Sequence, residues 1–382
     1  MDSKIILFLL SFLLSCNQLL PPPKIEEEKI STSNSTSDKT STDKYLDIYK
    51  VENCSYPRDK KFFVSVRDLQ CPETEEKDPY FESTIPTNIS GLEVDELDKL
   101  YVVDENKGIF ISSDSGKSFD NPTIIGVSKY NGIKVHKGVI YAISDTTLYR
   151  STDGGENFRA VSGILSGLKK IEISSQKQTV SMIFGQRSIV MEDYIYLLSS
   201  STIYVYNTSG SRVQEISSSA ICSDFCNLQD LSFSSNGYWY VATTKGISFS
   251  NNNGKSFVLK SFPGGSIENK ITSIFYAPDG KVYFTSLDGV GEFDPSLNSP
   301  NYILKDDLDP EVNFLKFFMD DSKNIYVAST KGLYIKKFSS KDFDIFDHNQ
   351  GLAEDYTSHV IADSKGNISV GSEKGLSVSL KE

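Results

Sequence analysis

The chain has 382 residues, with 51 acidic against 39 basic side chains and a formal net charge of −12 at pH 7. A chain this acidic is poorly suited to bind the phosphate backbone of a nucleic acid, so no nucleic-acid partner is expected. Its three histidines, His136, His348 and His359, lie far apart, and its five cysteines do not have a zinc-binding spacing. The sequence therefore predicts no metal site and no cofactor.

The first sixteen residues have the composition of an export signal. Lys4 is followed by an apolar run that is too short to span a bilayer comfortably. The end of this run, Leu13-Leu14-Ser15-Cys16, resembles the lipobox of bacterial lipoproteins. That resemblance implies a signal peptide over residues 1–15, cleavage before Cys16 and lipidation of Cys16, for example with palmitate. An ordinary secretory signal is the alternative.

The residues after the signal predict a tether. Residues 16–44 are rich in Pro, Glu, Ser, Thr, Asn and Lys and have almost nothing to bury, so they are expected to be disordered. A coil of this length has a root-mean-square span of roughly 30 Å, which would hold the folded part away from the lipid surface. Asn17 is not the aspartate that signals inner-membrane retention in many Gram-negative families. Anchoring at the outer membrane, facing the periplasm or the cell surface, is therefore expected.

A strand-turn-strand phrase of the form (I/V/L)-Y-(V/A) recurs through residues 89–382 at intervals of 40, 55, 44, 43, 43 and 43 residues. A fixed period of this size indicates one four-stranded antiparallel blade per repeat, so the sequence predicts an all-β, seven-bladed β-propeller. An eight-bladed ring is the alternative, if residues 45–88 form a blade of their own. The central residues of the phrase are Tyr101, Tyr141, Tyr196, Tyr240, Tyr283, Tyr326 and, in a degenerate copy, Ser369.

The final repeat stops after its third strand, near Leu380. The N-terminal segment 45–88 contains one strand-like run, Lys61–Val66. We expect this run to supply the missing outer strand and to close the ring, because closure removes an exposed sheet edge.

An eight-residue phrase follows the third strand of three repeats. Its pattern, S/T-x-D-x-G-x-x-aromatic, resembles the Asp box of BNR or sialidase-superfamily propellers. In such a turn the Asp or Asn oxygen caps backbone amides, the glycine takes a left-handed conformation and the aromatic ring packs between blades. The three copies contain Ser112, Asp114, Gly116 and Phe119; Ser151, Asp153, Gly155 and Phe158; and Ser250, Asn252, Gly254 and Phe257.

The last two repeats carry a second resemblance. The segment 349–376, with the pairs Gly351-Leu352 and Gly375-Leu376, is similar to propeller repeats in the sensors of bacterial two-component regulators. Those repeats usually have a tryptophan at the position of Ser369, so the match is partial.

The connections of a propeller divide between two faces. We call the face with the second-to-third and fourth-to-first connections the loop face, and the face with the first-to-second and third-to-fourth turns the turn face. The Asp-box-like turns are predicted on the turn face, which favours a structural role. Extra length over Ser162–Phe184 predicts a hairpin projecting from the loop face, where Asp306–Glu311 and His348–Gln350 are also expected.

Four lysines, Lys107, Lys245, Lys331 and Lys374, occupy equivalent second-to-third turns of the loop face. In a closed ring they would form a basic collar that attracts an anionic ligand. Ordinary Lys-Gly turn chemistry on a solvated surface is the favoured interpretation, and the collar is the alternative.

Four cysteines remain after Cys16, namely Cys54, Cys71, Cys222 and Cys226. An even number in an exported chain suggests two disulfides, and the spacing would let Cys222 and Cys226 close a small loop. Cys54 with Cys71 would then fix the N-terminal region, although the sequence does not settle the connectivity.

Three functional hypotheses follow. The first is a lipid-anchored envelope protein that binds a protein or glycan partner through its loop face. The second, implied by the Asp-box resemblance, is a sialidase-like glycoside hydrolase, which needs an arginine cluster to grip a carboxylate. The chain has only six arginines and lacks the arginine motif that opens the sialidase propeller, so no catalytic residues are assigned. The third, by analogy with similar propellers, is a periplasmic assembly factor for a membrane complex.

Overall fold

The computed structural model describes residues 81–379 except 86–87, 121, 128, 182–186, 223, 263–268, 297–299 and 306–311. Cys16, the predicted tether, Cys54, Cys71 and the run Lys61–Val66 lie outside the described residues, as does the acidic run Asp306–Glu311. Pro79–Glu382 forms one compact unit. No helix in the described part of the chain has the length and apolar character needed to cross a membrane.

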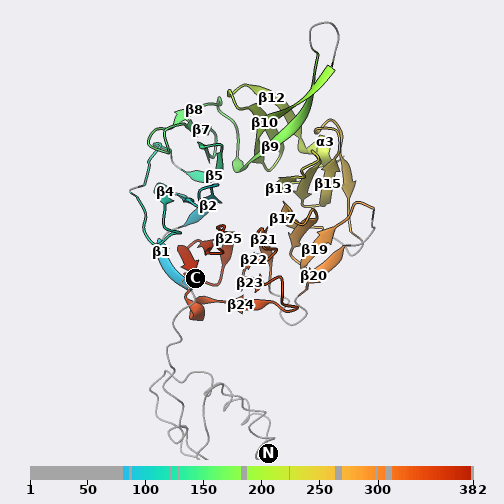
Figure 1. The fold of residues 1–382 in the computed structure, drawn as a ribbon. Helices are drawn as coiled ribbons and strands as arrows, with labels where there is room; N and C mark the ends of the chain where they lie inside the picture. Colours follow the sequence, from blue (N-terminus) through green and yellow to red (C-terminus); the bar gives the residue numbers. More distant parts are fainter. Residues whose placement is uncertain are drawn as a thin grey trace, which may run out of the picture. The chain divides into compact units, whose positions relative to one another are not determined.

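Seven antiparallel sheets are arranged in a ring, which confirms the predicted seven-bladed propeller (Figure 1). Blade 1 contains β2 (Ile89–Val94), β3 (Leu100–Asp104) and β4 (Gly108–Ser112); blade 2 contains β5 (Tyr130–His136), β6 (Val139–Ser144), β7 (Leu148–Ser151) and β8 (Arg159–Ala160). Blade 3 contains β9 (Leu168–Ser181), β10 (Arg187–Ser199), β11 (Thr202–Asn207) and β12 (Arg212–Ser217), and blade 4 contains β13 (Leu228–Phe233), β14 (Trp239–Thr243), β15 (Gly246–Ser250) and β16 (Val258–Lys260). Blade 5 contains β17 (Ile271–Tyr276), β18 (Val282–Ser286), β19 (Val290–Phe293) and β20 (Asn301–Leu304), and blade 6 contains β21 (Phe314–Met319), β22 (Ile325–Ser329), β23 (Gly332–Lys336) and β24 (Asp344–Phe346). Blade 7 contains β25 (Thr357–Ala362), β26 (Ile368–Ser372), β27 (Leu376–Ser379) and β1 (Phe81–Ile85).

Blade 1 departs from the four-stranded pattern. In the described residues its sheet has three strands, and a single bridge between Ile109 and Thr123 replaces a full outer strand. Two short helices, α3 (Ser218–Cys222) and η3 (His348–Gln350), lie in connections between blades.

The repeated tyrosine lies on the second strand of blades 1 to 6, where its ring is buried, and Ser369 takes its place in blade 7. In three blades its hydroxyl donates to an aspartate in the preceding first-to-second turn. These pairs are Tyr101 with Asp95 at 2.9 Å, Tyr283 with Asp279 at 2.7 Å and Tyr326 with Asp320 at 2.9 Å. Burial of the ring together with pairing of the hydroxyl explains why this residue type recurs at this position.

Ring closure uses a different strand from the predicted one. β1 pairs antiparallel with β27, with Phe81 opposite Ser379, and Phe81 is fully buried against the ring of Phe346. The prediction of an N-terminal closing strand is confirmed, but its assignment to Lys61–Val66 is wrong. The outer strand of blade 7 leads directly into β2, which starts at Ile89, so it must end within a few residues of that position. Closure thus joins the N- and C-terminal parts of the ring in one sheet.

Contacts between turns reinforce this closure on the turn face. Asp98 of blade 1 accepts hydrogen bonds from the backbone N–H of Ser364 at 2.9 Å and from its hydroxyl at 2.7 Å. Ser115 donates to Asp363 of blade 7 at 2.8 Å. The hydrogen bonds from Ser364 lower the pKa of Asp98, so this carboxylate remains ionised below the usual range.

The three eight-residue turns have the same hydrogen-bond pattern. In the first, Ser112 Oγ donates to Asp114 at 2.7 Å and accepts from the N–H of Gly116 at 2.8 Å, while Asp114 accepts from the N–H of Ser118 at 2.9 Å. The copies at residues 151–158 and 250–257 repeat these contacts. The glycines have positive φ, and a Cβ on any of them would meet a side chain of the preceding blade at 2.6–3.0 Å. These turns therefore fasten neighbouring blades together.

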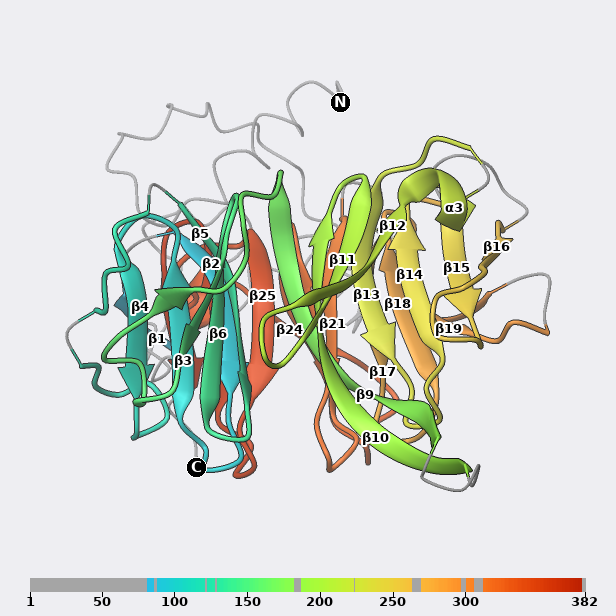
Figure 2. The same ribbon diagram turned by 90° about the horizontal axis from the view of Figure 1, so that it is seen from above.

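A hairpin does project from blade 3, but it is formed by β9 with β10 and lies on the turn face, not within Ser162–Phe184 on the loop face. β9 and β10 are 14 and 13 residues long, and their outer ends extend beyond the other strands of blade 3, on the side opposite α3 (Figure 2). The expectation of a loop-face insertion is wrong because the extra residues lengthen the first and second strands instead of the connection between blades. Asp193 contacts His136 at 2.9 Å and Lys137 at 2.6 Å, and this fastens the base of the hairpin to blade 2.

Gly254→Val should destabilise the propeller by about 2–4 kcal/mol, because a Cβ would lie 2.6 Å from the Trp239 ring at a φ of 74°. Gly154→Val is the matched control: its φ is 77°, but nothing lies within 4 Å of the added Cβ. Thermal unfolding of both variants separates the clash from the backbone strain. Equal falls in melting temperature would contradict this packing account.

Candidate functional site

A β-bulge recurs near the start of the innermost strand in all seven blades. The register of each first strand shifts by one residue, so its second residue has no partner on the neighbouring strand. The bulged residues are Ser90, Asn131, Lys169, Gln229, Thr272, Leu315 and Ser358. Four of them donate to the carbonyl of the first residue of the next blade's inner strand, as Ser90 does to Tyr130 at 2.6 Å. The bulge thus links adjacent blades around the channel.

Charged side chains beyond the bulges meet in the central channel. Lys134 of β5 contacts Glu93 of β2 at 2.9 Å and Glu172 of β9 at 3.5 Å. Glu172 also accepts from Lys170 at 3.2 Å. Three neighbouring blades are therefore joined by partly buried ion pairs.

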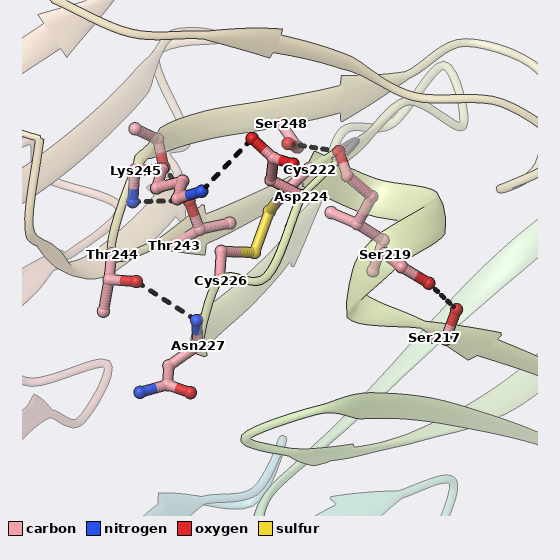
Figure 3. The surroundings of a disulfide bond; sticks show 12 residues. Ser217, Ser219, Cys222, Asp224, Cys226, Asn227, Thr243, Thr244, Lys245 and Ser248 are labelled. Atoms are coloured by element: carbon pink, nitrogen blue, oxygen red, sulfur yellow. Dashed lines mark hydrogen bonds and ion pairs between the residues drawn. A yellow bond between two sulfur atoms is a disulfide. The ribbon is translucent and has the colours of Figure 1, made fainter.

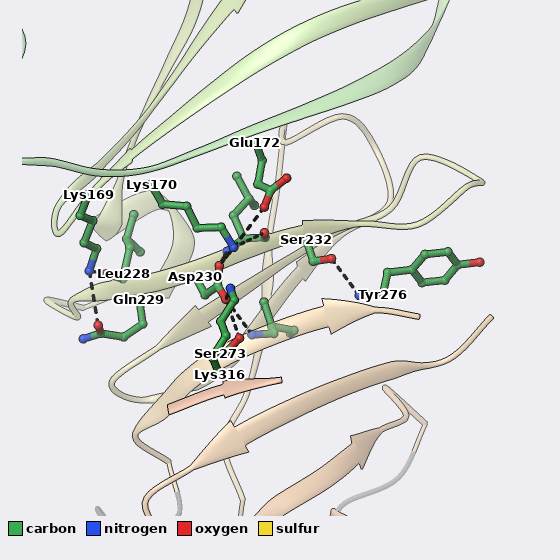
Figure 4. A network of polar contacts seen from close by, with 12 residues as sticks. Lys169, Lys170, Glu172, Leu228, Gln229, Asp230, Ser232, Ser273, Tyr276 and Lys316 are labelled. Atoms are coloured by element: carbon green, nitrogen blue, oxygen red, sulfur yellow. Dashed lines mark hydrogen bonds and ion pairs between the residues drawn. The ribbon is translucent and has the colours of Figure 1, made fainter. Parts of the chain in front are cut away.

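Asp230 is the centre of the same network (Figure 4). Its buried carboxylate pairs with Lys170 of blade 3 and, at 3.0 Å, with Lys316 of blade 6. It also accepts from the Ser273 hydroxyl at 2.7 Å and from the N–H of Ile274 at 3.2 Å. Because blades 4 and 6 are not neighbours in the ring, the pair of Lys316 with Asp230 crosses the channel.

Burial and neighbouring charges together set the pKa values of these groups. Burial lowers the pKa of Lys170 and Lys316 and raises that of Glu93. Burial also opposes ionisation of Glu172, but Lys134 and Lys170 outweigh it and lower the pKa of Glu172. The network holds three lysines against three carboxylates, so its charges balance only while every member is present.

A pocket of about 330 Å³ opens above this network at the loop-face mouth of the channel. Its lining residues are Asn88, Ser90, Glu105, Lys129, Asn131, Asp145, Gly167, Leu168, Lys169 and His359. Burial lowers the pKa of Lys169 to about 8 and that of His359 to about 4, the latter also under the influence of Lys316 and Lys170. The mouth therefore offers polar groups of both signs around a neutral histidine.

The four predicted collar lysines do lie in equivalent second-to-third turns of the loop face. Their backbone N–H groups bond to a side chain at the end of the second strand, as Lys107 does to Asp104 at 2.8 Å and Lys245 to Thr243 at 3.0 Å. The ammonium of Lys245 lies 3.7 Å from Asp224, and that of Lys374 lies 3.6 Å from Glu354. Turn chemistry thus accounts for these positions, and anion binding by Lys107, Lys245, Lys331 and Lys374 stays a prediction.

A disulfide joins Cys222 to Cys226 in the connection from blade 3 to blade 4 (Figure 3). Both cysteines are buried and pack in the cluster that contains Leu228 and Trp239. Between them Phe225 is 91% exposed. The loop closed by this disulfide therefore exposes the aromatic side chain of Phe225 on the loop face.

One group in the described part of the chain has the geometry to hold a cation. Asp347, His348 and Asp355, near η3, each offer an atom within 4.8 Å of the others. His348 Nδ1 already contacts Asp355 at 2.8 Å, and this contact raises the pKa of His348. An acidic partner for the histidine explains the cluster without a metal.

Sequence reasoning missed the channel network. Its signal is a register pattern: Lys170, Asp230, Lys316 and His359 each lie two residues after the start of an inner strand, and Glu93, Lys134 and Glu172 lie two residues further on. Charged residues at the same position of several buried first strands would have revealed it. The disulfide pairing of Cys222 with Cys226 was foreseen, whereas the exposed Phe225 was not.

No family model and no curated protein sequence matches the chain. Its fold is similar to the extracellular domains assigned to the hybrid two component systems BT4673 and BT3049 from B. thetaiotaomicron, with TM-scores of 0.63 and 0.58 and sequence identities of 14% and 13%. Those alignments cover 80% and 77% of this chain but 40% of each of those domains, so this chain spans less than half their length. The structure of YCF48 bound to D1 peptide is also similar, with a TM-score of 0.59, 12% identity, and coverage of 80% of this chain and 96% of that one. These likenesses establish the propeller fold.

Asp230→Asn should lower the free energy of unfolding by about 3–5 kcal/mol, because Lys170 and Lys316 would lose their buried counter-charge. Glu292→Gln is the matched control, since it breaks a surface pair with Lys281 and should cost at most about 1 kcal/mol. Urea unfolding measures both. A loss as small for Asp230→Asn as for Glu292→Gln would contradict a buried network.

His359 should make the fold weaker at mildly acidic pH. Its folded pKa is about 4, against about 6.5 in the unfolded chain, so between these values only the unfolded chain takes up the proton. Stability is therefore lost as pH falls below about 6.5, with about 2 kcal/mol lost between pH 7 and pH 5. Urea unfolding at both pH values should show a smaller loss for His359→Gln than for the wild type. Parallel losses would show that His359 is not held neutral.

Proposed function

We propose that this chain is an exported binding and scaffold module of the bacterial envelope that holds a protein partner against its loop face. The observation that carries the proposal is Phe225, which is 91% exposed in the short loop that the buried Cys222–Cys226 disulfide closes. Aromatic residues are enriched among the central residues of protein interfaces, and a disulfide-closed loop has less backbone entropy to lose on binding.

Other features of the loop face support this choice. Ile124 and Ile164, in the connections leading to β5 and β9, are 71% and 88% exposed. The channel mouth adds a polar pocket on the same face. The turn face also exposes apolar side chains, but Phe338 there lies under the ammonium of Lys323, which is 5.6 Å from its ring centre. Several exposed apolar side chains on one face fit a partner surface better than isolated turn residues do.

Similar propellers suggest the kind of partner and the compartment. One similar structure has a bound peptide, and others are extracellular domains of regulators. Together with the lipobox-like Leu13–Cys16, this favours a peptide or protein ligand outside the cytoplasm, with a glycan as the alternative ligand. The Asp-box relationship of the eight-residue turns and an outer-membrane location belong to the same proposal. A role as an assembly factor for a membrane complex would be one form of this protein binding.

The hydrolase alternative has less support. The sialidase reaction needs arginines gathered around the substrate carboxylate. The arginine side chains that the structure describes, Arg150, Arg159 and Arg212, lie on the third or fourth strands of their blades, away from the channel. Within the described residues, the channel charges are instead paired with one another.

A photo-crosslinking amino acid placed at position 225 should yield a discrete adduct in intact cells, because the proposal puts a partner over this residue. The same amino acid at position 338, an exposed phenylalanine of the turn face, is the matched control. Adduct bands from both sites are compared after denaturing electrophoresis. Adducts of equal yield at both positions, or at 338 alone, would contradict binding through the loop face.

Cys16→Ser should move the chain from the membrane fraction to the soluble fraction, because the proposal makes this thiol the point of lipid attachment. Cell fractionation and incorporation of labelled palmitate measure the change. Unchanged membrane association would overturn the lipid anchor without touching the loop-face proposal.

A further inference from the structure

A second pocket lies away from the loop face, between blades 2 and 3. Its volume is about 640 Å³, and eight of its lining residues come from the end of β7 and the segment 152–161. The ninth, Ser209, comes from the third-to-fourth turn of blade 3. Pockets of a few hundred Å³ are large enough to hold small organic ligands.

Two arginines lie side by side on the wall of this pocket. Arg150 of β7 and Arg159 of β8 are directly opposite in the antiparallel pair. Like charges at such positions repel each other. Neither guanidinium has a salt bridge among the described residues, whereas Arg212 of blade 3 pairs with Glu215 at 2.9 Å. Within the described residues, no acidic side chain therefore neutralises the charge of Arg150 or Arg159.

The Arg150 side chain also has an unmet hydrogen-bonding group. Its Nε is buried and has no acceptor within the described residues. Buried donors are normally paired, so this atom calls for an oxygen that the fold does not supply.

Asp153 lines the pocket but is already engaged by its own turn. It accepts from the backbone N–H of Asn157 at 3.0 Å, from the Asn157 amide at 2.9 Å and from the Ser151 hydroxyl at 2.7 Å. These hydrogen bonds lower the pKa of Asp153. The carboxylate therefore serves the turn, and the arginines remain available to a ligand.

We propose that this pocket binds a small acidic sugar, with the anionic group held between Arg150 and Arg159. Guanidinium groups form paired, charge-assisted hydrogen bonds with carboxylate and phosphate oxygens. Phe158, Ala160 and Val161 supply an apolar wall suited to the face of a sugar ring. A sugar carboxylate and a sugar phosphate share this chemistry, and the site is independent of Phe225 and the loop face.

The test is calorimetric titration of the full chain with three probes at constant ionic strength: glucuronate, glucose 6-phosphate and uncharged glucose. We expect saturable binding of one or both anionic probes and no binding of glucose. Arg150→Gln and Arg159→Gln should each weaken binding by about tenfold or more, because each removes a charged hydrogen-bonding pair. Arg212→Gln is the matched control and should leave the affinity within about twofold, since Arg212 is already paired.

The anionic probe that binds identifies the group the site prefers. No binding of either anionic probe, equal binding of glucose, or unchanged affinity in both arginine variants would overturn the proposal. If a variant fails to fold, hydrogen exchange of the wild-type chain decides. Glucuronate or glucose 6-phosphate should then slow exchange over residues 148–161, and an unchanged exchange pattern there would overturn the proposal equally.

Discussion

The register of the seven innermost strands is the constraint on which this propeller depends. Each of these strands contains a bulge at its second residue, which leaves that residue free of its own sheet. A bulged side chain such as Asn131 then reaches the carbonyl of Leu168 in the next blade at 2.6 Å. A slip of one residue would break this link and turn the following charged side chains from the channel into the sheet interface. Register, blade contact and channel lining are therefore set together.

The charges that this register places in the channel restrict where function can lie. Lys170, Asp230 and Lys316 are joined across the ring, so the middle of the channel is filled by paired groups. Buried ion pairs of this kind contribute little net stability compared with apolar packing, but losing one member is costly. We infer that they specify which blades face each other. The places that could bind a ligand are therefore the channel mouth, the loop connections and the pocket beside Arg150.

The sequence predicts the features that repeat and misses those that depend on three-dimensional register. The period of about 43 residues and the repeated tyrosine phrase predict seven blades, because each blade is built from local strand and turn signals. Closure is by β1 and not by Lys61–Val66 because the closing strand must lead directly into β2 at Ile89. Strand propensity, on which the choice of Lys61–Val66 rests, does not include this requirement. The hairpin was placed on the wrong face because the added residues extend β9 and β10, and length alone cannot show which connection has grown. The ion pair of Lys316 with Asp230 joins residues 86 positions apart and needs the closed ring to be seen.

Hydrogen exchange over the whole chain, with and without the partner recovered by crosslinking, tests most directly whether a partner binds the loop face. We expect slower exchange around Phe225, in the connections that lead to β5 and β9, and at the channel mouth. Protection confined to the turn face and the β9–β10 hairpin would contradict it.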